Sequence, residues 1–120
     1  MLYRSNKIYV EDSIVHGRGV FASERISKGE ILEECHVIEV PDTNLDYPHI
    51  LQRHFFQWPK GGNGIVICLG YGSIFNHSNE SPNANWETSL IDNKIIFFSR
   101  REINEGEEIF TDYGRQIMDV

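Results

Sequence analysis

Short apolar segments separated by turn residues constrain the fold of this 120-residue chain more than any other feature. The segments lie at residues 7–11, 20–22, 31–40 and 65–69, and Gly, Pro, Asn or Asp residues stand between them. Such a pattern predicts β-strands. Residues 85–91 and 94–100 flank Asp92 and Asn93, two residue types that tolerate the positive φ values of a tight hairpin. The sequence therefore predicts a mainly β domain with a hairpin around Asp92 and Asn93.

One segment has the spacing of a helix. Residues 48–58 read PHILQRHFFQW, in which Pro48 suits a first helical turn. Leu51, Phe55 and Trp58 would then lie on one face. We therefore expect a short helix here and a Gly-rich loop at residues 60–64. Phe55, Phe56 and Trp58 could line a peptide groove, but the prediction for these aromatic residues is the hydrophobic core.

Length and composition limit the organisation and the location of the chain. A chain of 120 residues suits one domain with one core, so we predict a single domain over residues 1–120. Cys35 and Cys68 stand outside any metal-binding pattern, which predicts buried free thiols and no metal site. No apolar run approaches the roughly 18 residues of a membrane span, and the first residues lack the apolar segment of a secretory signal. The expected location is cytoplasmic or nuclear.

The net charge of the chain bears on its partners. At pH 7 the formal charge is -7. An acidic surface opposes direct binding of nucleic-acid phosphates and attracts basic protein segments. We therefore expect no direct nucleic-acid binding, no membrane binding, and a basic partner.

Three segments carry the residues suited to binding or catalysis: HGRGVFA at 16–22, FNHSNESPNANW at 75–86 and REINEGEEIFTDYG at 101–114. Taken singly, each also fits an ordinary role: a turn that enters a strand, a polar loop, and a strand that ends in a packed tyrosine. The His and Ser residues lack the nucleophile setting of a hydrolase triad. The order and spacing of the three segments are more specific than any one of them.

In that order and at that spacing, the segments resemble the SET-domain protein lysine methyltransferases. GRGVFA, FNHS, SPNA and INEGEEIFTDYG carry the resemblance, which covers about residues 7–114. The small size and the sequence LGYGSIFNHS are most similar to the minimal stand-alone SET proteins of viruses and bacteria. The resemblance implies a single SET domain of β-clip fold, in which the FNHS and TDYG segments meet in a knot-like C-terminal crossing.

The resemblance also implies a cofactor and a set of site residues. The methyl donor would be S-adenosylmethionine and the acceptor a lysine side chain, with no metal. Tyr113 would sit where the methyl group is transferred, and Glu105 to Glu108 would shape the turn and strand that precede it. The implied cofactor residues are Arg18, Gly19, Val20, Asn76, His77 and Tyr113, and the implied lysine-channel residues are Tyr71 and Thr111. Tyr71 is also a candidate catalytic residue, and a place in the core is as open for it as a place in the channel wall.

The chemistry of lysine methylation fits these residue types. A lysine amine has a pKa of about 10.4, so the site must admit its neutral form. A tyrosine hydroxyl is mostly protonated at neutral pH, so Tyr113 is expected to orient the amine and not to act as a full general base. The resemblance also implies that the residue two before Tyr113 helps to set the room around the lysine nitrogen; Thr111 is small, which predicts di- or trimethyllysine as the product.

Some features of the family are absent after Tyr113, and other readings remain open. The tail has no cysteine-rich zinc segment, so Ile117 and Met118 or a second subunit of a homodimer would close the lysine channel. The substrate would be a basic lysine-containing segment of a histone or of another basic protein. The alternatives are a catalytically silent SET-like module that binds basic or methylated peptides, and a purely structural β-clip domain; cofactor binding and methyl transfer separate the three.

Overall fold

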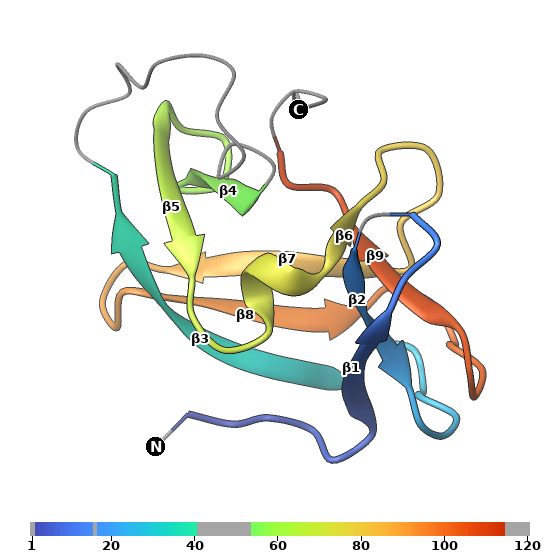
Figure 1. Cartoon of the computed structure of the whole chain (residues 1–120). Helices are drawn as coiled ribbons and strands as arrows, with labels where there is room; N and C mark the ends of the chain where they lie inside the picture. Colours follow the sequence, from blue (N-terminus) through green and yellow to red (C-terminus); the bar gives the residue numbers. More distant parts are fainter. Residues whose placement is uncertain (1, 16, 41–53, 115–120) are drawn as a thin grey trace.

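The computed structural model describes residues 2–15, 17–40 and 54–114, which form two β-sheets (Figure 1). The four-stranded sheet has the order β1-β2-β9-β6, and the five-stranded sheet has the order β4-β5-β3-β8-β7. There is no α-helix among the described residues; a short 3-10 turn, η2, spans Gly72–Ile74. The strands are β1 (Ile8–Asp12), β2 (Arg18–Ala22), β3 (Ile31–Glu39), β4 (Phe55–Trp58), β5 (Gly64–Cys68), β6 (Asn76–His77), β7 (Ala84–Ser89), β8 (Lys94–Ser99) and β9 (Glu108–Thr111).

The mainly β prediction is confirmed, and so is the hairpin. All four apolar segments named above contain strands, β1, β2, β3 and β5. β7 and β8 pair antiparallel from Ala84 opposite Ser99 to Ser89 opposite Lys94. Asn93 has a φ of 52°, the left-handed conformation that Asn tolerates better than most residues.

The predicted short helix is wrong over Phe55–Trp58. Phe55–Trp58 is strand β4, which pairs antiparallel with β5; residues 48–53 of the prediction lie outside the described residues. The aromatic residues suit a pleated strand, and the Gly-rich loop after them closes a hairpin. The pairing with β5 therefore decides the structure of this segment, although its apolar residues have the spacing of a helix. Phe55, Phe56 and Trp58 are buried, as the core prediction required.

The core contains residues from both sheets. Phe56 lies at the centre of an aromatic cluster, with its ring edge-on to Trp86 at 5.3 Å and to Phe97 at 5.5 Å between centroids. Edge-to-face packing is favoured because the positive edge of one ring meets the negative face of another. Cys35 and Cys68 are buried free thiols, as predicted.

The four-stranded sheet brings the three sequence segments together. β6 runs parallel to β9, with Asn76 opposite Phe110 and His77 opposite Thr111. On the other side of β9, Val20 of β2 lies opposite Ile109. The FNHS and TDYG segments therefore meet, as expected. The GRG segment, at the start of β2, lies on the other side of β9 from β6 (Figure 1).

Candidate functional site

Tyr113 is held by hydrogen bonds at its backbone and at its hydroxyl. It follows β9 and is 1% exposed. Its N–H donates to Nδ1 of His77 at 3.1 Å, and its carbonyl accepts from the N–H of Gln57 at 3.2 Å. The hydroxyl donates to the carbonyl of Phe75, with the carbonyl of Ser73 at 3.4 Å. The side chain is therefore restricted to one orientation.

The surroundings of Tyr113 also determine its protonation. Its ring stacks on Phe56 with 3.9 Å between centroids. Burial raises the pKa of the Tyr113 hydroxyl above its usual value of about 10. The hydroxyl is therefore protonated at neutral pH, and it can orient a partner but cannot serve as a base.

His77 supports Tyr113 through its neutral ring. Because Nδ1 accepts the Tyr113 N–H, the proton of the neutral imidazole lies on Nε2. Burial lowers the pKa of His77, and Asp112, whose Oδ1 is 3.9 Å from Nδ1, opposes this shift. The ring meets that of Tyr113 edge-on at 5.5 Å. The side chain thus acts on Tyr113, a contact that sequence reasoning did not anticipate.

Asn76 presents one amide oxygen from a fixed side chain. It is 7% exposed, and its Nδ2 lies 2.6 Å from Oε2 of Glu108 and 3.1 Å from the carbonyl of Arg18. Ser13 adds a third contact to Nδ2 at 3.2 Å and donates its own hydroxyl to Glu108 at 2.8 Å. No hydrogen bond among the described residues ends on Oδ1 of Asn76, so this acceptor is available to a ligand donor.

The GRG segment meets the FNHS segment through its backbone. A Cβ on Gly19 would lie 2.2 Å from Oε2 of Glu108, so glycine is needed for the carboxylate to pack on β2. Val20 is fully buried in the core. Arg18 is exposed, and its carbonyl faces Asn76. Glu108, which the sequence suggested only as a shaper of the strand, therefore joins the GRG and FNHS segments.

Thr111, at the end of β9, is fully buried. Its Oγ1 is the buried side-chain polar atom that lacks a hydrogen-bond partner within the described part of the chain. An unpaired buried hydroxyl costs about 1–3 kcal/mol. Thr111 lies opposite His77 and two residues before Tyr113, so its hydroxyl is an unused group next to the reaction-centre candidate.

Tyr71 lies in a different setting. It is half-buried and caps η2, and the guanidinium of Arg4 lies over its ring, 3.8 Å from the centroid. No ring contact between Tyr71 and Tyr113 is present among the described residues. The two residues are linked through the turn that follows Tyr71, whose Ser73 and Phe75 carbonyls face the Tyr113 hydroxyl.

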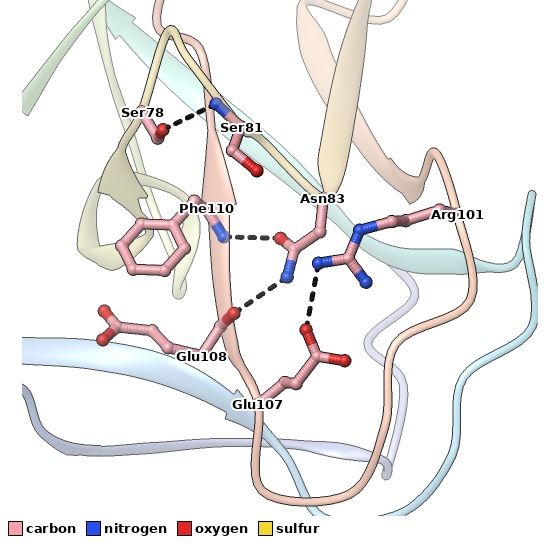
Figure 2. A pocket seen from close by; sticks show the side chains of 7 residues that line it. All are labelled: Ser78, Ser81, Asn83, Arg101, Glu107, Glu108 and Phe110. Atoms are coloured by element: carbon pink, nitrogen blue, oxygen red, sulfur yellow. Dashed lines mark hydrogen bonds and ion pairs between the residues drawn. The ribbon is translucent and has the colours of Figure 1, made fainter.

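A pocket of about 290 Å³, lined mostly by polar residues, lies beside Glu108 (Figure 2). Figure 2 shows Asn83 bridging two points of β9: its Oδ1 accepts from the Phe110 N–H at 2.7 Å, and its Nδ2 donates to the Glu108 carbonyl at 2.9 Å. The Asn of SPNA therefore holds the strand that delivers Tyr113. The lining residues are Ser78, Ser81, Asn83, Arg101, Glu107, Glu108 and Phe110.

Trp86 is a further contact that the sequence did not reveal. It is fully buried, and its Nε1 donates to the carbonyl of Asp112 at 2.5 Å. The adjacent carbonyl, that of Tyr113, accepts from Gln57, so consecutive carbonyls are held by different strands. A buried tryptophan whose N–H needs an acceptor is the signal that could have suggested such a contact.

Comparisons with known proteins identify the class. The SET domain family model matches residues 17–114. The histone-lysine N-methyltransferase, H3 lysine-37 specific, of Schizosaccharomyces pombe is 33% identical over 109 residues, which cover 88% of this chain and 71% of that protein. The N-lysine methyltransferase KMT5A-A of Xenopus laevis is 31% identical over 111 residues, 82% of this chain and 33% of that protein. A Plasmodium falciparum crystal structure, described as a candidate histone methyltransferase, aligns with a TM-score of 0.71 and 32% identity over 92% of this chain and 99% of that one.

Fold and site thus define a SET domain. The chain belongs to the SET-domain family and is a protein-lysine N-methyltransferase. SET domains use S-adenosylmethionine as the methyl donor. The site fits this cofactor, because Oδ1 of Asn76, which has no hydrogen-bond partner among the described residues, is an acceptor suited to the cofactor's ammonium group. No helix in the described residues is long and apolar enough to cross a membrane.

Proposed function

We propose that this chain methylates a lysine in a basic segment of another protein, with histone tails as the first substrate class to test. The observation that carries the proposal is Tyr113, whose buried hydroxyl faces the carbonyls of Ser73 and Phe75 and whose backbone N–H donates to His77. The Schizosaccharomyces pombe relative is named for a histone lysine. The net charge of -7 supports attraction of a basic substrate.

Each cofactor residue has a role that its contacts support. Bound S-adenosylmethionine supplies a methyl group already activated by its sulfonium. Asn76 accepts a hydrogen bond from the ligand's ammonium through Oδ1, while Glu108 and Ser13 keep its amide in place. The backbone of Arg18, Gly19 and Val20 and that of His77 line the rest of the site, in keeping with the resemblance in sequence.

Tyr113 orients the lysine amine and does not deprotonate it. Its hydroxyl proton is engaged by the Phe75 carbonyl, so the hydroxyl oxygen is left to accept an N–H from the amine. The aromatic, buried surroundings disfavour the charged ammonium by desolvation. The rate of transfer therefore comes mainly from alignment of a neutral amine.

Tyr71 and Thr111 are proposed as walls of the lysine channel. The half-buried ring of Tyr71 lies at the start of the turn that faces the Tyr113 hydroxyl. The hydroxyl of Thr111, which lacks a hydrogen-bond partner within the described residues, can hold a water molecule or the amine. Because threonine is smaller than an aromatic residue, we propose that the channel accepts an already methylated amine.

The organisation of the protein in the cell is also a proposal. We infer that residues 1–120 act as one SET domain and that a second subunit contributes to the closing of the lysine channel. A nuclear or cytoplasmic location follows from a histone or other basic protein as the substrate. Analytical ultracentrifugation with and without cofactor tests the dimer.

Labelled S-adenosylmethionine tests the proposed substrate class. The protein is incubated with histones, with ribosomal proteins as a second basic set, and with an acidic protein as a control, and the modified lysines are mapped by mass spectrometry. We expect label on histone lysines and none on the acidic protein. Label on the ribosomal set alone would reassign the substrate, whereas peptide binding without transfer would support the silent module.

A further inference from the structure

The N-terminal segment before the matched SET residues is bound tightly to β3. The Ser5 N–H donates to the Leu32 carbonyl at 2.8 Å, and the Glu34 N–H donates to the Tyr3 carbonyl at 2.8 Å. Arg4 lies between these two bonds, opposite Glu33 in a short antiparallel bridge. The family model matches residues 17–114, so this segment lies before the matched region.

Glu33 is a buried carboxylate that depends on this segment. Its side chain is 2% exposed, and Nε of Arg4 lies 2.6 Å from its Oε2. The N–H of Tyr71 also donates to the carboxylate, at 3.1 and 3.3 Å from the two oxygens, and the thiol of Cys35 adds a side-chain hydrogen bond. The Arg4 side chain is 45% exposed, so the pair is buried on the Glu33 side alone; loss of Arg4 would leave the buried Glu33 carboxylate without its charged partner, which is destabilising locally.

The same carboxylate determines the path of the chain into the η2 turn. Gly70 has a φ of +68°, and a Cβ there would lie 2.7 Å from Oε2 of Glu33 and 3.1 Å from a guanidinium nitrogen of Arg4. The guanidinium also covers the ring of Tyr71 at 3.8 Å. Arg4 and Glu33 therefore fix both the backbone and the side chain of the residue that starts the turn.

The turn carries the acceptors of the Tyr113 hydroxyl. The N–H groups of Ile74 and Phe75 both donate to the Tyr71 carbonyl, at 2.8 and 3.2 Å. The orientation of the turn therefore depends on the position of Tyr71. The carbonyls of Ser73 and Phe75 face the hydroxyl of Tyr113. A displacement at Tyr71 moves these carbonyls relative to the hydroxyl.

We propose that Arg4 and Glu33 are positioning residues for methyl transfer, acting through Tyr71 and the η2 turn on the hydroxyl of Tyr113. The proposal rests on the role given to Tyr113 under the proposed function. The N-terminal segment is then part of the catalytic domain, and Tyr71 links it to the site. Arg4 lies outside residues 17–114, which the family model matches.

Arg4→Met is the variant that tests the proposal, because methionine keeps an unbranched apolar side chain and removes the charge and the Nε donor. Wild type and variant are compared under saturating S-adenosylmethionine, on the basic protein that the wild type methylates, at a temperature where both are folded by circular dichroism. We expect kcat to fall by about ten- to a hundredfold, because small misplacements in a reacting site cost this much. The Kd for the cofactor should change by less than about threefold, since the cofactor residues contact neither Arg4 nor Glu33.

Two further variants separate positioning from general stability. Arg25→Met removes an exposed ion pair with Glu102, whose side chains are 66% and 51% exposed, and should leave kcat unchanged. Arg4→Met combined with Glu33→Gln removes both charges and keeps an acceptor for the Tyr71 N–H, so it should recover much of the kcat lost by Arg4→Met.

The outcomes are distinguishable from a failure of the proposed function. If wild type transfers no methyl group, the proposed function fails first. If wild type is active and Arg4→Met has the same kcat as Arg25→Met, the positioning role is overturned. If Arg4→Met does not fold, Arg4→Lys, which keeps the charge but not the planar group over Tyr71, replaces it; a wild-type kcat for that variant would also overturn the inference.

Discussion

Replacement of Trp86 by phenylalanine should lower both stability and turnover, because Trp86 holds the chain directly before Tyr113. The change removes the Nε1 bond to the Asp112 carbonyl, now 2.5 Å long, from a fully buried side chain. An acceptor left without its donor costs about 1–3 kcal/mol. Partial loss of the indole adds about 1–2 kcal/mol, less than the roughly 3–5 kcal/mol of complete truncation. The free energy of unfolding should therefore fall by about 2–5 kcal/mol, within the roughly 5–15 kcal/mol of a typical domain.

Trp58→Phe is the matched control for this variant. Trp58 is also buried, at 7% exposed, but no hydrogen bond joins its side chain to residues 112–114. Urea unfolding at constant m value gives the loss of stability of each variant, and single-turnover methyl transfer below the unfolding transition gives the rate. We expect both variants to lose stability and only Trp86→Phe to lose rate. Equal rates in the two variants would refute the idea that the indole N–H positions Tyr113.

Three other changes test separate parts of the site. Gly19→Ala places a Cβ against Glu108, 2.2 Å from Oε2, so calorimetry should show at least about tenfold weaker cofactor binding; unchanged affinity would remove the Glu108 contact from the site. Burial lowers the folded-state pKa of His77, so its contribution to stability is complete above the unfolded pKa of about 6.5 and is lost as pH falls below it; His77→Gln should flatten the decline in unfolding free energy between about pH 7 and pH 5, and an identical decline would contradict this. Thr111→Val removes an unpaired buried hydroxyl and should raise the unfolding free energy by up to about 1 kcal/mol, whereas Thr111→Tyr should shift mass-spectrometric products from di- or trimethyllysine to monomethyllysine; exclusive monomethylation by wild type would refute the proposed room in the channel.

The strands could be predicted from local sequence because their signal is local. Apolar runs bounded by turn residues gave the positions of β1, β2, β3 and β5, and Asp92 with Asn93 gave the β7–β8 hairpin. The helix prediction for residues 55–58 was wrong for a physical reason. The apolar residues have helical spacing, but pairing with β5 and burial of the aromatic side chains in the core decide the structure of this segment. The spacing of apolar residues within one segment does not show which strand that segment will pair with.

The site was predictable only as far as the resemblance reached. It pointed to Asn76, His77 and Tyr113, which the structure brings together, but it could not give the contacts that hold them. The bond from Trp86 to Asp112 spans 26 residues, and the pair of Arg4 and Glu33 spans 29. Such pairs depend on the final packing of two sheets, so neither partner has a signal in its own neighbourhood.

The measurement that tests the central claim most directly is methyl transfer by Tyr113→Phe, made together with its affinity for S-adenosylmethionine. The variant removes one hydroxyl and leaves the ring that stacks on Phe56. We expect a folded protein with cofactor affinity within about threefold of wild type and with turnover lowered by at least about tenfold, because the hydroxyl acts on alignment in the transition state. Turnover by Tyr113→Phe at the wild-type rate would contradict the account and remove Tyr113 from the reaction centre.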